Sequence, residues 1–423
     1  MTLCLRGPLL IPRLDAAVSF YPDGLLAGGD DGLLRFAGPA ASAPEPLRES
    51  ARPSRGFMLP PLVDIHTHIP QHPIRGHFVD GVPDDPPPAE GRLLAGLLRN
   101  VFPAEVRCAR EAHAAAVVDA FLADTLSHGV VGGAAYMTTS ALATRVALQR
   151  LPATWSVGLV LMDQQCPLDI RSQADHLQRD VESLAADFGR RLIVTDRFAV
   201  AVSSPLRRRA ASLAGRLGLR TQTHLNEQVA EKMLVETELY PGRSYTQVYQ
   251  SDGLLAHDCI VAHCIQMTPE EWDLLADAGA VVAHCPTSNL LLGSGVMPLD
   301  EVKARGLPYA LATDVGASPT VSMLAEMRRF LQVHAGRSVA ATACEALVRA
   351  TVAPAAWLEW ADGTGTLEPG RPMSFIEVAA TCDPHRCTAE EAVTALLPQD
   401  PDDPPPAVQR VTLHGITAYS RPS

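Results

Sequence analysis

The chain has 423 residues, of which 47% are hydrophobic and 19% are charged, and its formal net charge is −12. This length and composition fit a large folded enzyme and exclude a disordered or fibrous protein. The acidic balance argues against nonspecific nucleic-acid binding and against a polybasic membrane anchor. The sequence contains no apolar run that could cross a bilayer, no signal-peptide pattern at its start and no CxxC pair among nine cysteines, so we expect a cytoplasmic protein.

The two ends of the chain carry strand-like runs. Residues 1–56 contain short apolar runs broken by Gly, Pro and Asp, the pattern of β-hairpins. This segment is too short to form a stable domain alone, and the runs at 373–380 and 408–419 would complete it. We therefore predict a small discontinuous β-sandwich domain made of residues 1–56 and 371–423.

Strand-like and helix-like runs alternate between these ends, from residue 57 to residue 370. This alternation is typical of parallel α/β architecture. Eight strands would close a (β/α)₈ barrel of the TIM type. The predicted strands lie at 62–68, 130–137, 155–162, 192–200, 219–225, 259–264, 280–285 and 308–314.

Helix signals fall between the predicted strands. The Thr-Pro-Glu-Glu run at 268–271 is a capping box with Pro at the first helical position, and Gly279 would end that helix. Another helix would open at Ser204 and stop at Gly218. We interpret the three consecutive arginines inside it, 207–209, as a solvated helix face and not as a nucleic-acid patch.

A loop rich in Pro and Asp follows the first predicted strand, at residues 72–92. A loop at the C-terminal face of a barrel strand is placed to act as a lid over a site or to contact a second subunit. A semi-rigid surface loop is the alternative interpretation.

Histidine and acidic residues stand at the ends of several predicted strands. His66 and His68 are two residues apart, so a strand would send both imidazoles to one face. The strand ends of a barrel converge, which would bring His224, His263 and Asp314 to the same place. We therefore predict that these five residues bind a divalent metal, His263 either directly or through contact with the other ligands. Imidazole and carboxylate donors suit Zn²⁺ or another borderline ion.

A metal at this place would lower the pKa of a water molecule toward neutrality. Glu227, three residues after His224, is placed to carry protons, Asp314 can accept a proton from the nucleophile, and His263 can stabilise a developing oxyanion. Each residue also has a simpler explanation, such as a hydrogen-bonded histidine at the edge of a core or a glutamate at a helix N-terminus. Their joint placement at strand ends favours catalytic roles.

These motifs resemble those of the amidohydrolase superfamily, and over nearly its whole length the chain resembles the guanine deaminases within it. The more specific points of resemblance are HIPQ at 68–71, NVFPAE at 100–105, DRFA at 196–199, QTHLNE at 222–227 and HCPTSNLLLGSG from 284. The chain departs from the family at Asp196, where a Pro is usual.

The resemblance implies hydrolytic deamination of guanine to xanthine and ammonia by a homodimer. It implies one Zn²⁺ per chain, with Fe²⁺ or another divalent ion as the alternative. It also implies that Gln71, Arg197 and Phe198 contact the purine, Arg197 on the O6 side and Phe198 on the ring face. A guanidinium fork suits a purine carbonyl and ring nitrogen. Taken singly, a surface arginine, a core phenylalanine and a loop amide would explain these residues as well.

Two other functions compete with this interpretation. The chain could be an amidohydrolase that acts on another aminated heterocycle, such as a pterin, an oxidised guanine or a triazine. It could also be a catalytically inactive metal-binding barrel that serves as an assembly partner, although the presence of both Glu227 and Asp314 argues against this.

Overall fold

The structure is a computed structural model that describes residues 3–83, 91–256, 258–360, 363–379 and 382–422. The predicted lid or dimer contact at 72–92 falls partly on residues 84–90, which lie outside the described residues. The chain divides into two compact units, which are Met1–Asp64 with Ala123–Gly133 and Val321–Ser423, and Ile65–Leu122 with Ala134–Thr320.

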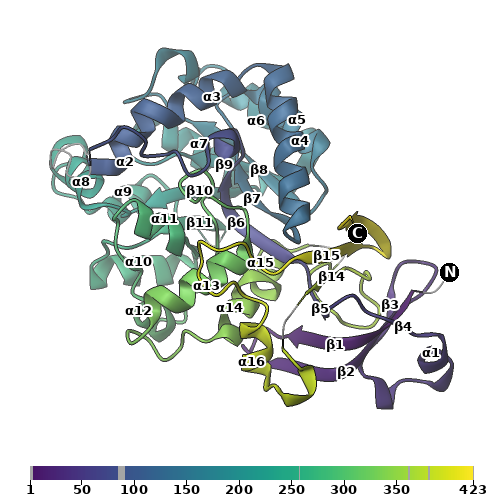
Figure 1. Ribbon diagram of the computed structural model, residues 1–423. Coiled ribbons are helices and arrows are strands. Elements are labelled where there is room, and N and C mark those ends of the chain that lie inside the picture. The colour runs from purple at the N-terminus through teal and green to yellow at the C-terminus, as the bar shows by residue number, and fades with distance from the viewer. Residues whose placement is uncertain (1–2, 84–90, 257, 361–362, 380–381, 423) are drawn as a thin grey trace. The chain divides into compact units, whose positions relative to one another are not determined.

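Strands from both ends of the sequence form one mixed sheet in the first unit, in the order β16-β15-β14-β5-β1-β2-β3, with β4 paired to β1. Figure 1 shows these strands in purple and in yellow-green. The short strand β5 joins the two groups, because Met58 pairs with Leu9 of β1 and Leu59 pairs with Ile376 of β14. The predicted β-domain built from both ends is thus confirmed. Its strands are β1 (Cys4–Pro12), β2 (Val18–Gly28), β3 (Leu34–Pro39), β4 (Arg52–Pro53), β5 (Phe57–Leu59), β14 (Phe375–Val378), β15 (Val408–Leu413) and β16 (Ile416–Ser420).

Apolar side chains of these strands, together with Leu367 and Met373 from the chain before β14, form a core. It comprises Leu5, Leu9, Leu26, Leu34, Met58, Leu367, Met373 and Phe375. Burial of such side chains supplies the main stabilising term for a sheet of this kind. The helices of this unit are α1 (Glu45–Ser50), α13 (Met323–His334), α14 (Ala343–Ala350), α15 (Val352–Trp357) and α16 (Ala389–Thr394).

The second sheet contains eight strands in the order β6 to β13, and neighbours along the chain are neighbours in the sheet. Every residue of β6, β7 and β8 is buried, as expected where helices cover one face of a sheet and the barrel interior fills the other. The predicted (β/α)₈ barrel is confirmed. Its strands are β6 (Leu62–His68), β7 (Val130–Tyr136), β8 (Trp155–Leu161), β9 (Leu192–Asp196), β10 (Arg220–Leu225), β11 (Cys259–His263), β12 (Val281–His284) and β13 (Tyr309–Leu311).

Two backbone hydrogen bonds join the last strand segment to the first. The amide of Asp314 donates to the carbonyl of His66 over 2.8 Å, and the amide of His68 donates to the carbonyl of Val315 over 2.6 Å. Asp314 therefore lies beside the two histidines of β6 although some 250 residues separate them in sequence. Strand β13 itself is shorter than the predicted 308–314, and β9 ends at Asp196 and not at residue 200.

The helices that follow the barrel strands begin and end at the predicted signals. Thr268 caps α10 through a capping box with Glu271, and Gly279 ends it in the left-handed conformation. Helix α7 ends likewise at Gly218. The helical segments are η2 (Ile69–Ile74), α2 (Gly91–Gly96), η3 (Leu97–Val101), α3 (Phe102–Cys108), α4 (Glu111–Ser127), α5 (Ala141–Arg150), α6 (Leu177–Phe188), α7 (Ser204–Leu217), α8 (Val229–Met233), α9 (Tyr245–Ser251), α10 (Pro269–Ala278), α11 (Pro286–Leu291) and α12 (Leu299–Ala304).

The prediction that the arginine run of α7 is solvated is wrong for Arg207. Its side chain is fully buried and binds Asp196 and Asp252, each over 2.8 Å, whereas Arg208 and Arg209 are exposed. A helix turns each successive side chain by about 100°, so one of three consecutive residues can point inward. Two carboxylates then compensate the cost of burying the guanidinium.

Candidate active site

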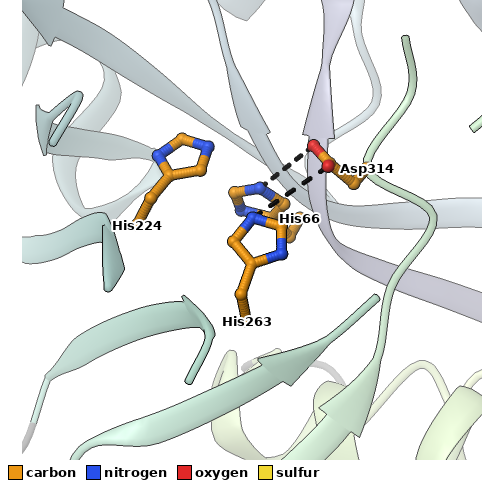
Figure 2. Close-up of side chains that lie close together, drawn as sticks. All are labelled: His66, His224, His263 and Asp314. Carbon is orange, nitrogen blue, oxygen red and sulfur yellow. Dashed lines mark ion pairs between the residues drawn. The ribbon is translucent and has the colours of Figure 1, made fainter. Parts of the chain in front are cut away.

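The predicted metal-binding side chains converge at the C-terminal ends of the barrel strands. Ligand atoms of His66, His224, His263 and Asp314 all lie within 4.8 Å of one another. Figure 2 shows the three imidazoles and the carboxylate around one point, with Asp314 joined to His66 and His263. His68 belongs to the same cluster, since its Nε2 lies 3.2 Å from Oδ1 of Asp314 and 3.3 Å from Nε2 of His224.

Three residues near this cluster adopt the left-handed backbone conformation. The φ angles are 49° at Asn226, 73° at His263 and 53° at Asp314. For a residue other than glycine this conformation costs roughly 1–2 kcal/mol. Each of the three stands at or just after the end of a barrel strand, where the chain leaves the hydrogen-bonded ladder. Strain of this kind gathers at functional sites.

Hydrogen bonds fix the orientation of two side chains of the cluster. Nδ1 of His224 lies 2.5 Å from the carbonyl oxygen of Arg197, and an oxygen there can only accept, so Nδ1 carries the hydrogen. The Nε2 atom of His224 then keeps a lone pair for a metal. The hydroxyl of Ser288 donates to Oδ2 of Asp314 over 2.6 Å. Such outer contacts hold metal ligands in place.

Burial and mutual charge set the protonation of the cluster. Burial lowers the pKa of His66 to about 4 against the opposing effect of Asp314, and burial lowers the pKa of His224 well below its usual range. Burial alone would raise the pKa of Asp314, but hydrogen bonds from His66 and His68 outweigh it and lower that pKa well below its usual range. At neutral pH, His66 and His224 are therefore neutral imidazoles and Asp314 is an ionised carboxylate.

This donor set fits a divalent metal ion. Neutral imidazole nitrogens and one carboxylate are the ligands of Zn²⁺ and related borderline ions. Among the described residues, Nε2 of His263 has no hydrogen-bond partner although it is buried, which is the state expected of a ligand atom. The residues that could hold the ion are His66, His68, His224, His263 and Asp314.

Glu227 stands beside this cluster on the segment that follows β10. Its Oε2 lies 3.5 Å from Nε2 of His263, and its Oε1 accepts a hydrogen bond from Ser294 over 3.0 Å. Burial, followed by the charge of Asp314, raises the pKa of Glu227 to about 8. A protonated carboxyl group is therefore available at neutral pH as a proton donor.

A cavity opens beside the cluster. The three predicted purine contacts, Gln71, Arg197 and Phe198, line it together with His68, Glu227 and Asp314. Its apolar wall includes Phe78, Leu93 and Leu97. The residues predicted for substrate and for catalysis thus face one common space, which suits a flat, polar-edged ligand.

Residues 57–403 match the model of the Amidohydrolase family. The chain belongs to this family. The amidohydrolase is 29% identical to the guanine deaminase of Escherichia coli (strain K12) in an alignment that covers 88% of this chain and 84% of that protein. It is 30% identical to the guanine deaminase of Homo sapiens in an alignment that covers 78% of this chain and 74% of that protein.

Solved structures share the fold of this amidohydrolase. The guanine deaminase from C. acetobutylicum with bound guanine in the active site has a TM-score of 0.85 at 21% identity, covering 99% of this chain and 100% of that one. The atrazine chlorohydrolase from Arthrobacter aurescens TC1 complexed with zinc has a TM-score of 0.79 at 18% identity, covering 99% and 95%. The combination of barrel and terminal β-domain is therefore common to these proteins.

Three groups of residues that contact the predicted site of this amidohydrolase were not predicted from the sequence. Ser288 binds Asp314, and Asn289 binds His263. Both residues lie in the HCPTSN motif, from which no role was predicted for them. Tyr136 ends β7, and its ring centre lies 4.4 Å from that of His68. Its position at a strand end was the available signal. The third group is Glu105, which binds Arg197.

Proposed function

We propose that this amidohydrolase converts guanine and water to xanthine and ammonia. The observation that carries the proposal is the single cavity shared by the metal-binding cluster, the proton donor Glu227 and the cation Arg197. The guanine deaminases of Escherichia coli and Homo sapiens, which are 29% and 30% identical over most of their length, support the same reaction.

We propose one Zn²⁺ per chain, with Fe²⁺ or another divalent ion as the alternative. The buried cluster of imidazoles and one carboxylate supports a metal of this class. When bound, the ion would supply a nucleophile at neutral pH by lowering the pKa of water.

The chain's own residues move the protons. Asp314, ionised at neutral pH, takes a proton from the attacking water, whose oxygen forms a bond to C2 of guanine. Glu227, protonated at the start, gives its proton to a ring nitrogen, then takes the second proton of the water oxygen and passes it to the departing amine. The proton held by Asp314 returns Glu227 to its protonated form. His263, anchored by Asn289, stabilises the negative charge that develops on the oxygen. The C2–N bond breaks and ammonia leaves.

Three residues recognise the purine in this proposal. Arg197 directs guanidinium N–H groups to O6, Phe198 packs on the ring, and the amide of Gln71 binds an edge nitrogen. Arg197 and Phe198 follow directly after β9, and the Phe198 ring centre lies 6.5 Å from that of His224. A base held by these side chains would have its 2-amino group near the metal-binding cluster.

A homodimer in the cytoplasm is the further expectation. Among the described residues, no helix combines the length and the apolarity that a bilayer crossing requires. Light scattering of the purified protein tests the dimer, which predicts twice the chain mass of 45.1 kDa.

A substrate panel tests the proposed reaction. Deamination of guanine, a pterin, 8-oxoguanine and an aminotriazine would be followed as ammonia release, by the wild type and by Arg197→Met. The proposal predicts the highest kcat/KM for guanine and a fall of about 10-fold or more in the variant, since a hydrogen bond to a charged donor is lost. A higher kcat/KM for a pterin or triazine would assign a different substrate.

A further inference from the structure

Helix α3 presents two buried side chains to Arg197, which lines the cavity. Phe102 and Glu105 are three residues apart, so they lie on one face of the helix, and both are at most 2% exposed. The π-helical turn η3 precedes α3 and contributes Leu97 to the cavity. Phe102 and Glu105 of the FPAE motif thus form one face of α3, and this face has no role in the proposed reaction.

This face holds the guanidinium of Arg197. Nη1 of Arg197 lies 2.5 Å from Oε1 of Glu105, and both side chains are buried. Cζ of Arg197 lies 5.3 Å from the ring centre of Phe102, which is the range of a cation–π contact. A guanidinium has five N–H donors, so an ion pair through one nitrogen leaves donors for a ligand in the cavity.

The same carboxylate oxygen also contacts Gln71. Nε2 of Gln71 lies 3.4 Å from Oε1 of Glu105, and Oε1 of Gln71 lies 3.4 Å from the amide nitrogen of Gly316. These contacts orient the amide of Gln71. Because they are long for hydrogen bonds, the amide can still bind a ligand. Among the described residues, Oε2 of Glu105 has no hydrogen-bond partner although it is buried. Oε1 of Glu105 therefore contacts both Arg197 and Gln71, the two polar side chains predicted to bind the purine.

We propose that Glu105 is a positioning residue that gives the site its preference for a 6-oxopurine. It acts through Arg197, whose planar fork reads the O6 atom only if its orientation is fixed. Without the carboxylate, the guanidinium is free to turn toward Glu227 or Asp314, which line the same cavity. The inference rests on the proposed function, since it assumes that a purine occupies the cavity.

Binding of two unreactive bases tests this role without relying on turnover. Hypoxanthine carries O6 and purine does not, and both lack the amino group that deamination removes. Their Kd values would be measured by calorimetry on metal-loaded wild type and Glu105→Gln. The wild type should bind hypoxanthine about 10-fold or more tightly than purine, and the variant should lose most of this preference while its affinity for purine changes little.

Two further variants separate positioning from general stability. Glu377→Gln removes a buried glutamate that pairs with Arg410 in the terminal sheet, and it should keep the wild-type preference. In the double variant Glu105→Gln/Arg197→Met, no buried arginine is left without its partner, so it should fold if the single variant does not. It should bind both bases as Arg197→Met alone does, since Glu105 acts through Arg197.

The outcomes distinguish this inference from the proposed function. Glu105→Gln that keeps the wild-type preference overturns the role of Glu105, and so does a double variant that binds hypoxanthine more weakly than Arg197→Met. A wild type that turns over guanine but prefers neither base also overturns it. A wild type that prefers hypoxanthine and does not turn over guanine, with the preference lost in Glu105→Gln, supports Glu105 and overturns the reaction.

Discussion

Nδ1 of His263 lies 2.9 Å from the side-chain oxygen of Asn289. Because an amide oxygen only accepts, Nδ1 carries the hydrogen and Nε2 keeps its lone pair. Nε2 lies 3.5 Å from Oε2 of Glu227 and 4.0 Å from Oδ2 of Asp314, so its lone pair is on the side of the ring that faces these two carboxyl groups. Asn289 therefore decides which nitrogen of His263 can bind a metal or stabilise an oxyanion.

Replacing Asn289 with Ala should lower kcat about 10- to 100-fold, because loss of an outer partner lets the imidazole rotate and change tautomer. Asn289→Asp keeps an acceptor oxygen and should lose less. Steady-state kinetics on guanine, with metal content measured on each sample, checks both variants. Equal losses in the two would show that the acceptor oxygen is not what matters.

Glu227→Gln should reduce kcat by about 10²- to 10⁴-fold, since an amide cannot transfer the proton. The variant should retain its metal, because Glu227 is placed to carry protons and not to bind the ion. Xanthine formation and elemental analysis on the same preparation provide the two readouts. Loss of the metal along with activity would make Glu227 a ligand instead.

Activity should fall as the pH rises through about 8. Glu227 must hold a proton at the start of the cycle, and burial raises its pKa from the usual 4.5 to about 8, so the active form persists below that pH and disappears above it. Asp314, whose pKa lies well below its usual range, is ionised at the start of the cycle at every pH in this range. A profile of kcat/KM against pH from 5 to 10 measures this limb. Activity that keeps rising above pH 8 would mean that Glu227 acts in its ionised form.

Arg207→Met should destabilise the fold by about 3–5 kcal/mol, because it leaves Asp196 buried without its cation and leaves Asp252 paired only with the exposed Arg208. Arg209→Met, at an exposed position in the same helix, is the matched control and should change the free energy of unfolding by less than about 0.5 kcal/mol. Urea denaturation followed by circular dichroism compares them. Similarly small changes in the free energy of unfolding for both variants would show that water reaches Arg207, Asp196 and Asp252.

Apolar runs were enough to predict the barrel, because strands such as β8 are buried on both faces and are largely apolar. The metal-binding cluster was predicted from the positions of its residues, because His224 and His263 lie at the C-terminal ends of their strands and these ends meet in a barrel. The lengths of β9 and β13 could not be predicted in the same way. Tertiary contacts, not side-chain pattern, end those strands.

Charged residues were harder to place, because burial depends on partners that are distant in sequence. Arg207 resembled its exposed neighbours, and its partner Asp252 is 45 residues away. Glu105 belongs to the FPAE motif, but its partner Arg197 is 92 residues away, so no local pattern connects the two residues. Such pairs become visible only when the fold brings their elements together.

The most direct test of the proposed reaction is guanine turnover by the purified protein, followed as xanthine formation, with bound metal quantified on the same sample. The account predicts turnover with about one metal ion per chain, and loss of turnover when a chelator removes the metal. Protein that holds its metal but forms no xanthine would contradict the assignment of guanine. Protein that neither contains zinc nor takes it up would contradict the metal-binding cluster itself.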